Sequence, residues 1–334
     1  MNYKRTLVAF LALVLVLAAF PALAQETIVP GETYTGTLEA SNAQYSFSAA
    51  AGDLFVFALN SDDFDAKVEV YDGNGNLIAE DDDSGEGRNA LLAFPVAEAG
   101  DYTLRVTSWS GEPSGTYTLE TQQVTPVAVP VDGSVELATD GANPLYAMFE
   151  GEAGDVVNVW AISNNDEDTK ISIVSFNDGE QVGEDDDNGP GTNPYVRRLV
   201  LPNTGSYLVT VSPLFDRELT GSISLNIETT DKLFVDEAGI TVTLGELNET
   251  EVFTMNAESG ASYIITISSA SADVSYRLEI RDGSFFGPGA SVNDISLLGV
   301  GYTPSFGGEI EFVLDYSAFG SSNEFTVNVQ QLSE

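Results

Sequence analysis

The stretch Ala99-Gly100-Asp101-Tyr102-Thr103-Leu104-Arg105-Val106 decides the fold class, because a glycine introduces side chains that alternate between apolar and polar. Alternation with a period of two residues is typical of a β-strand that has one face buried. Two later stretches, 205–211 and 308–314, repeat the glycine and the apolar positions. The chain therefore contains one strand-based unit three times.

Each unit also has an earlier glycine, about 50 residues before the one that introduces this strand. An apolar residue lies five positions before this earlier glycine. The glycine pairs are Gly52 and Gly100, Gly154 and Gly205, and Gly260 and Gly308. Val, Tyr, Phe and Thr are abundant between them, and Gly or Asn turns recur. We predict an all-β chain of three tandem antiparallel β-sandwiches of the jelly-roll-like kind, at residues 25–124, 125–230 and 231–334. The proline-containing stretch 122–130 is expected to be an extended linker.

The first 24 residues have the pattern of a secretory signal peptide. Lys4 and Arg5 supply the positive charge, 7–20 is apolar, and Ala22-Leu23-Ala24 provides small residues at the cleavage site. We expect a secreted, extracellular protein, with the periplasm as the alternative. No later apolar run reaches the length of a membrane span, and without cysteine no disulfide can form.

The composition argues against several functions. With 52 Asp and Glu against 12 Lys and Arg, the net charge of −40 would repel nucleic acid. The chain has no histidine, which excludes Ser-His-Asp, Cys-His and His-ligated zinc sites. Glycoside hydrolysis by two carboxylates stays open on residue types, but no pair stands out. We expect a protein that is not an enzyme.

Two acidic constellations recur in the same register in the first two units. In each, an Asp-x-Lys step, at 65–67 and 168–170, is followed by Glu-Asp-Asp-Asp at 80–83 and 184–187. Calcium accepts six to eight oxygen ligands, and dense carboxylates repel one another without a cation. We predict one calcium site in each unit, and the alternative is a solvated acidic loop. The candidate ligands are Asp65, Asp81, Asp82, Asp83, Asp168, Asp185, Asp186 and Asp187.

The third unit lacks an acidic run, so no equivalent site is expected there. Its comparable regions contain only Asp273, Asp282, Asn293 and Asp294.

Two tryptophans are candidates for ligand binding. Trp160 follows an alternation that would place it on the face opposite Val159, and Trp109 lies in a segment rich in turn residues. Exposed aromatic rings can stack on sugars or anchor a protein partner, so an extracellular polysaccharide or protein matrix is a candidate ligand. Alternatively, these rings cover a domain junction or the second layer of a sandwich.

The motifs of the first unit resemble those of the bacterial pre-peptidase C-terminal domain. They run in order through Phe47, Ala51-Gly52-Asp53, Asp65, 70–75 and 78–83 and end with the strands at 99–106 and 115–119. The resemblance covers the second unit well, whereas the third unit keeps only the strand scaffold. It implies a jelly-roll-like sandwich without catalytic residues that commonly follows a secreted hydrolase and is similar to the calcium-binding, matrix-binding sandwich of clostridial collagenases. No peptidase is expected here, because the signal and three units account for the length.

The sequence is thus interpreted as a secreted, non-catalytic, calcium-stabilised array that acts as an adhesion or accessory binding module. A carbohydrate- or matrix-binding protein that uses exposed aromatic residues is the alternative, and a carboxylate-dependent glycoside hydrolase is a third. The sequence does not predict an oligomeric state.

Overall fold

The computed structural model describes most of the chain after residue 24. The described ranges are 25–39, 42–111, 114–139, 141, 143–214, 218–243, 250–269, 274–281, 289–292, 297–305, 307–318 and 324–332. Within them the chain forms strands, turns and loops but no helix. Accordingly, this part of the chain contains no helix with the length and hydropathy of a membrane span.

The first unit consists of nine strands within the described residues. They are β1 (Glu26–Thr27), β2 (Thr33–Glu39), β3 (Ala43–Ala49), β4 (Leu54–Asn60), β5 (Ala66–Tyr71), β6 (Leu77–Asp81), β7 (Ala90–Pro95), β8 (Gly100–Ser108) and β9 (Ser114–Val124). Five of them form one sheet in the order β1-β3-β8-β5-β6, and four form a second sheet in the order β2-β9-β4-β7. The two sheets enclose one hydrophobic core, which makes the unit a β-sandwich.

The second and third units repeat this topology strand for strand. The second unit comprises β10 (Val127–Ala128), β11 (Gly133–Ala138), β12 (Leu145–Gly151), β13 (Val156–Ser163), β14 (Thr169–Ser175), β15 (Gln181–Asp185), β16 (Tyr195–Val200), β17 (Gly205–Pro213) and β18 (Ser222–Thr229). The third comprises β19 (Leu233–Phe234), β20 (Ile240–Thr243), β21 (Thr250–Ala257), β22 (Tyr263–Ser269), β23 (Val274–Arg281), β24 (Gly289–Val292), β25 (Leu297–Tyr302), β26 (Gly308–Ala318) and β27 (Glu324–Gln331). The all-β fold of three sandwiches predicted from the sequence is confirmed.

The alternating strand that the later glycine of each unit introduces is the central strand of its five-stranded sheet. These strands are β8, β17 and β26, and each is paired on both sides. The alternating residues predicted to face the core are at most 8% exposed. They are Tyr102, Leu104, Val106, Tyr207, Val209, Val211, Ile310, Phe312 and Leu314.

The structure differs from the sequence prediction in two details, the direction of one strand in each unit and the length of the linker between the first two units. The short first strand of each five-stranded sheet pairs in parallel with its neighbour, as β1 does with β3. The expected linker at 122–130 is largely used by the sandwiches, because Val124 still pairs with Leu54 and Val127 already pairs with Ala147. The first two units are therefore joined by a very short connection.

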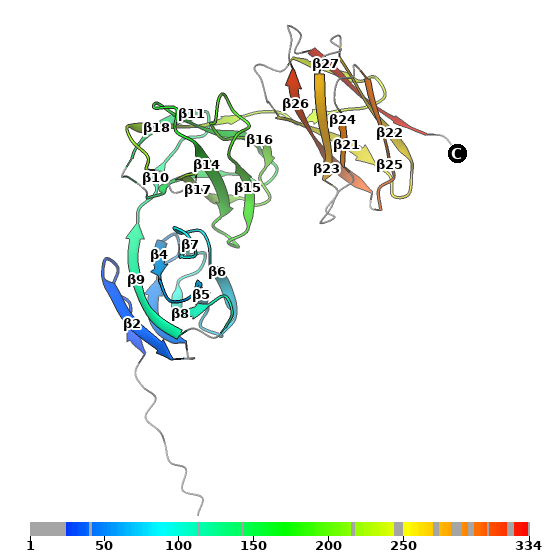
Figure 1. Ribbon diagram of the computed structural model, residues 1–334. Helices are drawn as coiled ribbons and strands as arrows, with labels where there is room; N and C mark the ends of the chain where they lie inside the picture. Colours follow the sequence, from blue (N-terminus) through cyan, green and yellow to red (C-terminus); the bar gives the residue numbers. More distant parts are fainter. Residues whose placement is uncertain are drawn as a thin grey trace, which may run out of the picture.

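The first and second units lie next to each other (Figure 1), and apolar side chains form the contact between them. Leu54 of the first unit packs in one buried cluster with Phe176 and Leu208 of the second, and these side chains are at most 5% exposed. Residues on the outer face of the second unit's five-stranded sheet, such as Tyr146 and Val174, surround this cluster. The junction thus buries apolar surface and stabilises the contact between the units.

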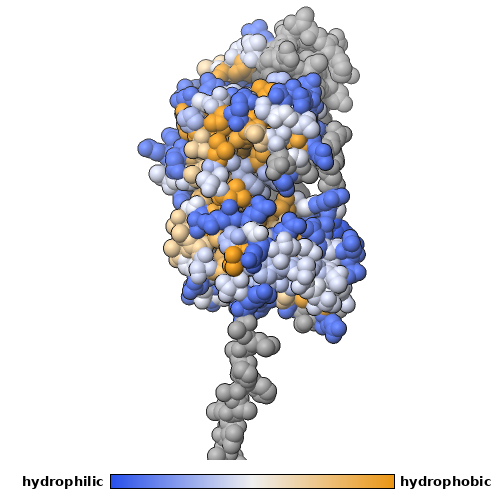
Figure 2. Space-filling model, turned by 90° about the vertical axis from the view of Figure 1, so that its left-hand side faces the viewer, coloured by the Kyte–Doolittle hydropathy of each residue, from blue (hydrophilic) through white to orange (hydrophobic). Residues whose placement is uncertain are grey.

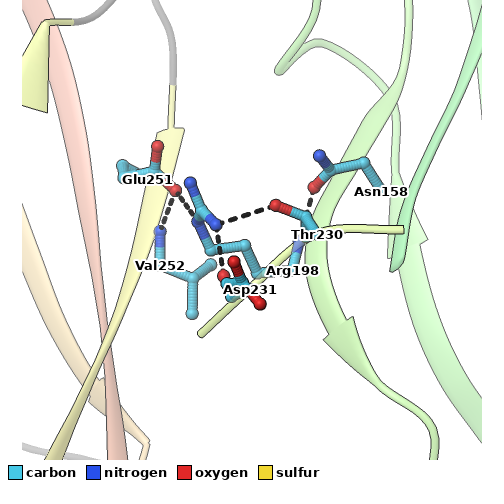
Figure 3. A network of polar contacts seen from close by, with 6 residues as sticks. All are labelled: Asn158, Arg198, Thr230, Asp231, Glu251 and Val252. Atoms are coloured by element: carbon cyan, nitrogen blue, oxygen red, sulfur yellow. Dashed lines mark hydrogen bonds and ion pairs between the residues drawn. The ribbon is translucent and has the colours of Figure 1, made fainter. Parts of the chain in front are cut away.

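The second and third units meet through a polar network around Arg198 (Figure 3). Arg198 lies in a β-bulge of β16 with φ of 48°, in the left-handed region. Its Nε donates to Oε1 of Glu251 at 2.7 Å, and its Nη1 donates to Oγ1 of Thr230 at 3.0 Å and to the carbonyl of Asp231. Only 8% of the Glu251 side chain and 17% of the Arg198 side chain are exposed. The pair therefore connects β16 to β21 away from bulk solvent.

The face shown in Figure 2 carries both hydrophilic residues and hydrophobic patches. On this face, the patches are separated by hydrophilic residues. Among the large hydrophobic side chains that the structure describes, Trp109 is the most exposed, at 66%.

Candidate metal centre

The acidic residues of the first two units gather at one end of each five-stranded sheet. β5 pairs with β6 in antiparallel register, with Val68 opposite Asp81. In the second unit, Ile171 is opposite Asp185. The start of one strand therefore lies beside the end of the next, and this brings Asp65 and Asp168 to the same end of the sheet as the acidic loops, residues 81–90 and 185–194.

Asp81 and Asp185 hold the acidic loops together. Oδ2 of Asp81 accepts the backbone N–H groups of Ser84 and Leu91 at 3.3 and 2.7 Å. Oδ2 of Asp185 accepts those of Asn188 and Tyr195 at 3.0 and 2.7 Å. One carboxylate thus ties the start of each loop to the strand that follows it.

Burial raises the pKa of both carboxyl groups. Desolvation is the main cause, and it outweighs the backbone hydrogen bonds that favour the charged form. The pKa of Asp185 rises to about 6. An ionised carboxylate at this position is therefore costly unless a positive charge is nearby.

Asn89 and Asn193 complete the loops, and the sequence reasoning missed them. Their Oδ1 atoms accept the backbone N–H groups of Ser61 at 3.0 Å and Ser163 at 2.9 Å. Their carbonyl groups accept the N–H of a loop glycine, and a Cβ on Gly85 or Gly189 would lie 2.7 Å from that carbonyl oxygen. The pattern Asp-Asp-Asp-x-Gly-x-Gly-x-Asn at 81–89 and 185–193 could have revealed both asparagines, because it recurs in register.

Asp65 and Asp168 each have a buried oxygen without a partner. In both residues Oδ1 is buried and receives no hydrogen bond. Their backbone carbonyls are engaged, since they accept the N–H groups of Trp109 at 3.1 Å and Leu214 at 3.0 Å. A buried carboxylate oxygen without a donor is costly, and a hard cation would satisfy it. These two residues fit a calcium site.

The other candidate ligands lie nearer to solvent. Asp82 is half-buried, and Asp83, Asp186 and Asp187 are exposed. Desolvation raises the pKa of Asp187, and the negative charges of Asp186 and Asp168 raise it further. Asp168 and Asp187 are therefore close enough to repel each other.

The carboxylates do not yet form a complete coordination group. Among the residues that the structure describes, no three acidic side chains converge closely enough to hold a metal ion. The calcium sites stay a prediction, with the orphaned oxygens in their favour. Asp273, Asp282, Asn293 and Asp294, considered for the third unit, lie outside the described residues.

The two tryptophans differ in their surroundings. Trp109 is 66% exposed, and Nζ of Lys67 lies 5.4 Å from its ring centroid. Trp160 is half-buried on β13 and packs against Tyr195, with 5.2 Å between ring centroids. Trp109 is thus more accessible to a ligand than Trp160.

Comparison with known proteins identifies the first unit. Residues 41–108 match the sequence profile of the bacterial pre-peptidase C-terminal domain, which confirms the predicted resemblance for this unit. No curated protein matches the chain.

One solved structure to which the chain is similar is the pre-peptidase C-terminal domain of a collagenase from Bacillus anthracis, at 21% sequence identity. The match covers 29% of this chain and 94% of the collagenase domain, with a TM-score of 0.25. Another is PliG of Aeromonas hydrophila, a periplasmic inhibitor of g-type lysozyme, at 16% identity, with 31% of this chain and 97% of its own covered and a TM-score of 0.23.

Proposed function

We propose that the chain is a secreted, non-catalytic accessory binding module whose first two sandwiches are stabilised by calcium. The observation that carries this proposal is the buried, unpartnered Oδ1 atom of both Asp65 and Asp168. The two atoms occur at equivalent positions of separate units, each beside a loop rich in carboxylates. One unsatisfied oxygen alone would be weak support for a ligand. Its recurrence at the equivalent position of the second unit favours the same kind of ligand in both units.

In the proposed sites, Asp65 and Asp168 supply buried oxygens and the acidic loops supply exposed ones. Asp82 and Asp83 belong to the first site, and Asp186 and Asp187 belong to the second. Asp81 and Asp185 shape the loops by accepting backbone N–H groups. Bound calcium would neutralise the carboxylates, whose mutual repulsion otherwise opposes the folded loop.

The module would serve as an adhesion or accessory element because stiff loops present a fixed surface to a partner. The matched family profile supports an accessory role for the first unit. The lack of histidine and cysteine in the sequence supports a role without catalysis.

Thermal unfolding of the mature protein tests the calcium proposal. We expect calcium to raise the melting temperature relative to EDTA, and magnesium to raise it much less. At free calcium about 100-fold above the dissociation constant, the gain is about 2.7 kcal/mol per site. Asp65→Asn and Asp168→Asn should each remove part of the gain, whereas Asp62→Asn, an exposed acidic control outside the loops, should keep it.

Equal, weak effects of calcium and magnesium in all variants would contradict the calcium proposal. The acidic loops would then be solvated loops.

A second candidate function is binding of a polysaccharide or protein matrix through Trp109, which its 66% exposure favours. Trp109→Ala should then reduce retention on a polysaccharide or collagen matrix without lowering the melting temperature. Trp160→Ala is the comparison, because its ring already packs on Tyr195. Unchanged retention in the Trp109→Ala protein would refute this function.

A further inference from the structure

A cavity of about 890 Å³ lies between the first and second units. One wall is formed by β6 and β7, and the other by β14 and β17 of the second unit's five-stranded sheet. This volume is in the range of pockets that enclose a ligand rather than a few water molecules. The cavity borders the first acidic loop through Asp81 and Asp83, but neither Asp65 nor Asp168, whose Oδ1 atoms are buried, lines it.

Both first-unit strands that line the cavity are edge strands. β6 is the last strand of the order β1-β3-β8-β5-β6, and β7 is the last of β2-β9-β4-β7. An edge strand presents backbone N–H and C=O groups that no neighbouring strand uses, and an extended peptide can pair with them. The cavity therefore borders two sheet edges; the N–H of Leu91 on β7 already donates to Asp81, so β6 is the edge considered for strand addition.

The cavity also offers apolar side chains to such a peptide. Ile78 on β6 is 43% exposed and lines the cavity with Leu92 of β7, which is half-buried because it also packs against the core of the first unit. From the second unit, the partly buried Val174 lines the cavity and packs against the junction cluster, whereas Leu208, at 1% exposed, forms the cavity floor within that cluster. That cluster fixes the two walls relative to each other, so the cavity is formed before a ligand binds.

The charge of the cavity is strongly negative. Six carboxylates line it, with Lys170 as the single cation among the described lining residues. The six are Asp72, Glu80, Asp81, Asp83, Glu98 and Asp178.

Neighbouring groups neutralise this charge only in part. Glu80 is paired with Lys67 at 2.9 Å, and Lys170 is itself paired with Glu184 at 2.9 Å. Glu98 forms no ion pair within the described part of the chain, whereas Asp83 belongs to the proposed first calcium site. A partly enclosed, acidic cavity attracts a cationic ligand.

We propose that this cavity binds an extended peptide with alternating apolar and Lys or Arg side chains, which adds as a strand to β6. Backbone pairing supplies the register, Ile78 and Leu92 contact the apolar side chains, and Glu98 attracts the basic ones. This proposal names a ligand for the accessory role and rests on the binding part of the proposed function, not on calcium.

Fluorescence anisotropy with labelled hexapeptides tests this proposal on the full mature protein. The probe is Lys-Val-Lys-Val-Lys-Val with capped ends, and the comparisons are Glu-Val-Glu-Val-Glu-Val and the Lys peptide with N-methylated valines. We expect the Lys peptide to bind, more weakly as salt increases. The Glu peptide should not bind, and N-methylation should weaken binding at least about tenfold because it removes the donors for strand pairing.

Matched variants locate the binding site. Ile78→Ser should weaken binding of the Lys peptide about tenfold, whereas Leu77→Ser, a neighbour on β6 with similar exposure that does not line the cavity, should leave it unchanged. Glu98→Gln should weaken binding, and Glu86→Gln, also exposed but outside the cavity, should not.

Binding that ignores N-methylation and Ile78→Ser, or no binding up to about 1 mM peptide, would overturn the cavity proposal. Retention on a polysaccharide matrix that Ile78→Ser weakens, without peptide binding, would also overturn it in favour of a carbohydrate ligand. Each titration is run in calcium and in EDTA. If calcium raises the melting temperature but no peptide binds, the cavity proposal alone is refuted. If the peptide binds but calcium does not raise the melting temperature, the calcium proposal alone is refuted.

Discussion

Breaking the Arg198–Glu251 pair should loosen the third unit from the second. The carboxylate of Glu251 is 8% exposed and receives the Nε of Arg198 at 2.7 Å, together with the backbone N–H of Val252 at 3.0 Å. Removing one partner of a buried ion pair costs about 3–5 kcal/mol, because the other charge is left in a poorly solvated place. Glu251 keeps one hydrogen bond and can regain water if the junction opens, so we expect about 2–3 kcal/mol for Arg198→Ala.

A double-mutant cycle separates this pair from general effects of truncation. We expect a coupling energy of about 1.5–3 kcal/mol between Arg198→Ala and Glu251→Ala. The control cycle uses Lys170 and Glu184, whose charged atoms lie 2.9 Å apart but whose side chains are 40% and 53% exposed. This exposed pair should couple by less than about 1 kcal/mol, because water screens it.

The assay must report on the third unit, whose sequence contains no tryptophan. Hydrogen exchange with mass spectrometry across a urea series provides this, with peptides from β21 as the reporter. Exchange in β21 should accelerate in Arg198→Ala and stay unchanged in Lys170→Ala. A coupling energy for Arg198 and Glu251 no larger than that of the exposed pair would refute the reasoning that burial makes this contact strong.

Three further predictions concern single side chains, each checked by thermal or urea unfolding in EDTA. Asn193→Ala should lower the free energy of unfolding by about 2 kcal/mol, because the buried Asn193 loses its hydrogen bonds with Ser163 and Pro190. Asn89→Ala should lower it less, because Asn89 is half-buried. Equal losses in the two variants would contradict the role of burial. Leu208→Ala should cost about 2–4 kcal/mol by opening a void at the junction of the first two units, and a cost below about 1 kcal/mol would mean that the junction is not packed. Gly115→Ala should destabilise the first unit by about 1–3 kcal/mol, because the φ of Gly115 is 132° and an added Cβ would lie 2.2 Å from the Cβ of Asp63. Gly75→Ala should destabilise it less, because Gly75 has a φ of 83° but open space where the Cβ would lie.

The fold was predictable because its signal is local and repeated. Alternation at Tyr102, Leu104 and Val106 reflects a strand with one buried face, and three copies made that interpretation secure. The alternation around Trp160 also predicted correctly that Val157 and Val159 face the core. The parallel pairing of β1 with β3 was not predictable in this way, because a strand of two residues carries no periodicity.

The candidate site was predictable only in part. The recurring carboxylates marked the right loops, but three adjacent aspartates look equivalent in a sequence. Only the structure shows that the side chain of Asp81 accepts backbone N–H groups across its loop while Asp83 is exposed. The contact of Arg198 with Glu251 depends on a β-bulge and on the placement of two units, and neither leaves a pattern in the sequence.

Calorimetric titration of calcium into the protein lacking residues 1–24, with magnesium as the competitor, tests the central claim most directly. We expect one calcium ion per acidic loop, loss of one of the two binding events in Asp65→Asn and loss of the other in Asp168→Asn. No calcium-specific heat in the wild-type protein, or binding that persists when both aspartates are replaced, would contradict the claim.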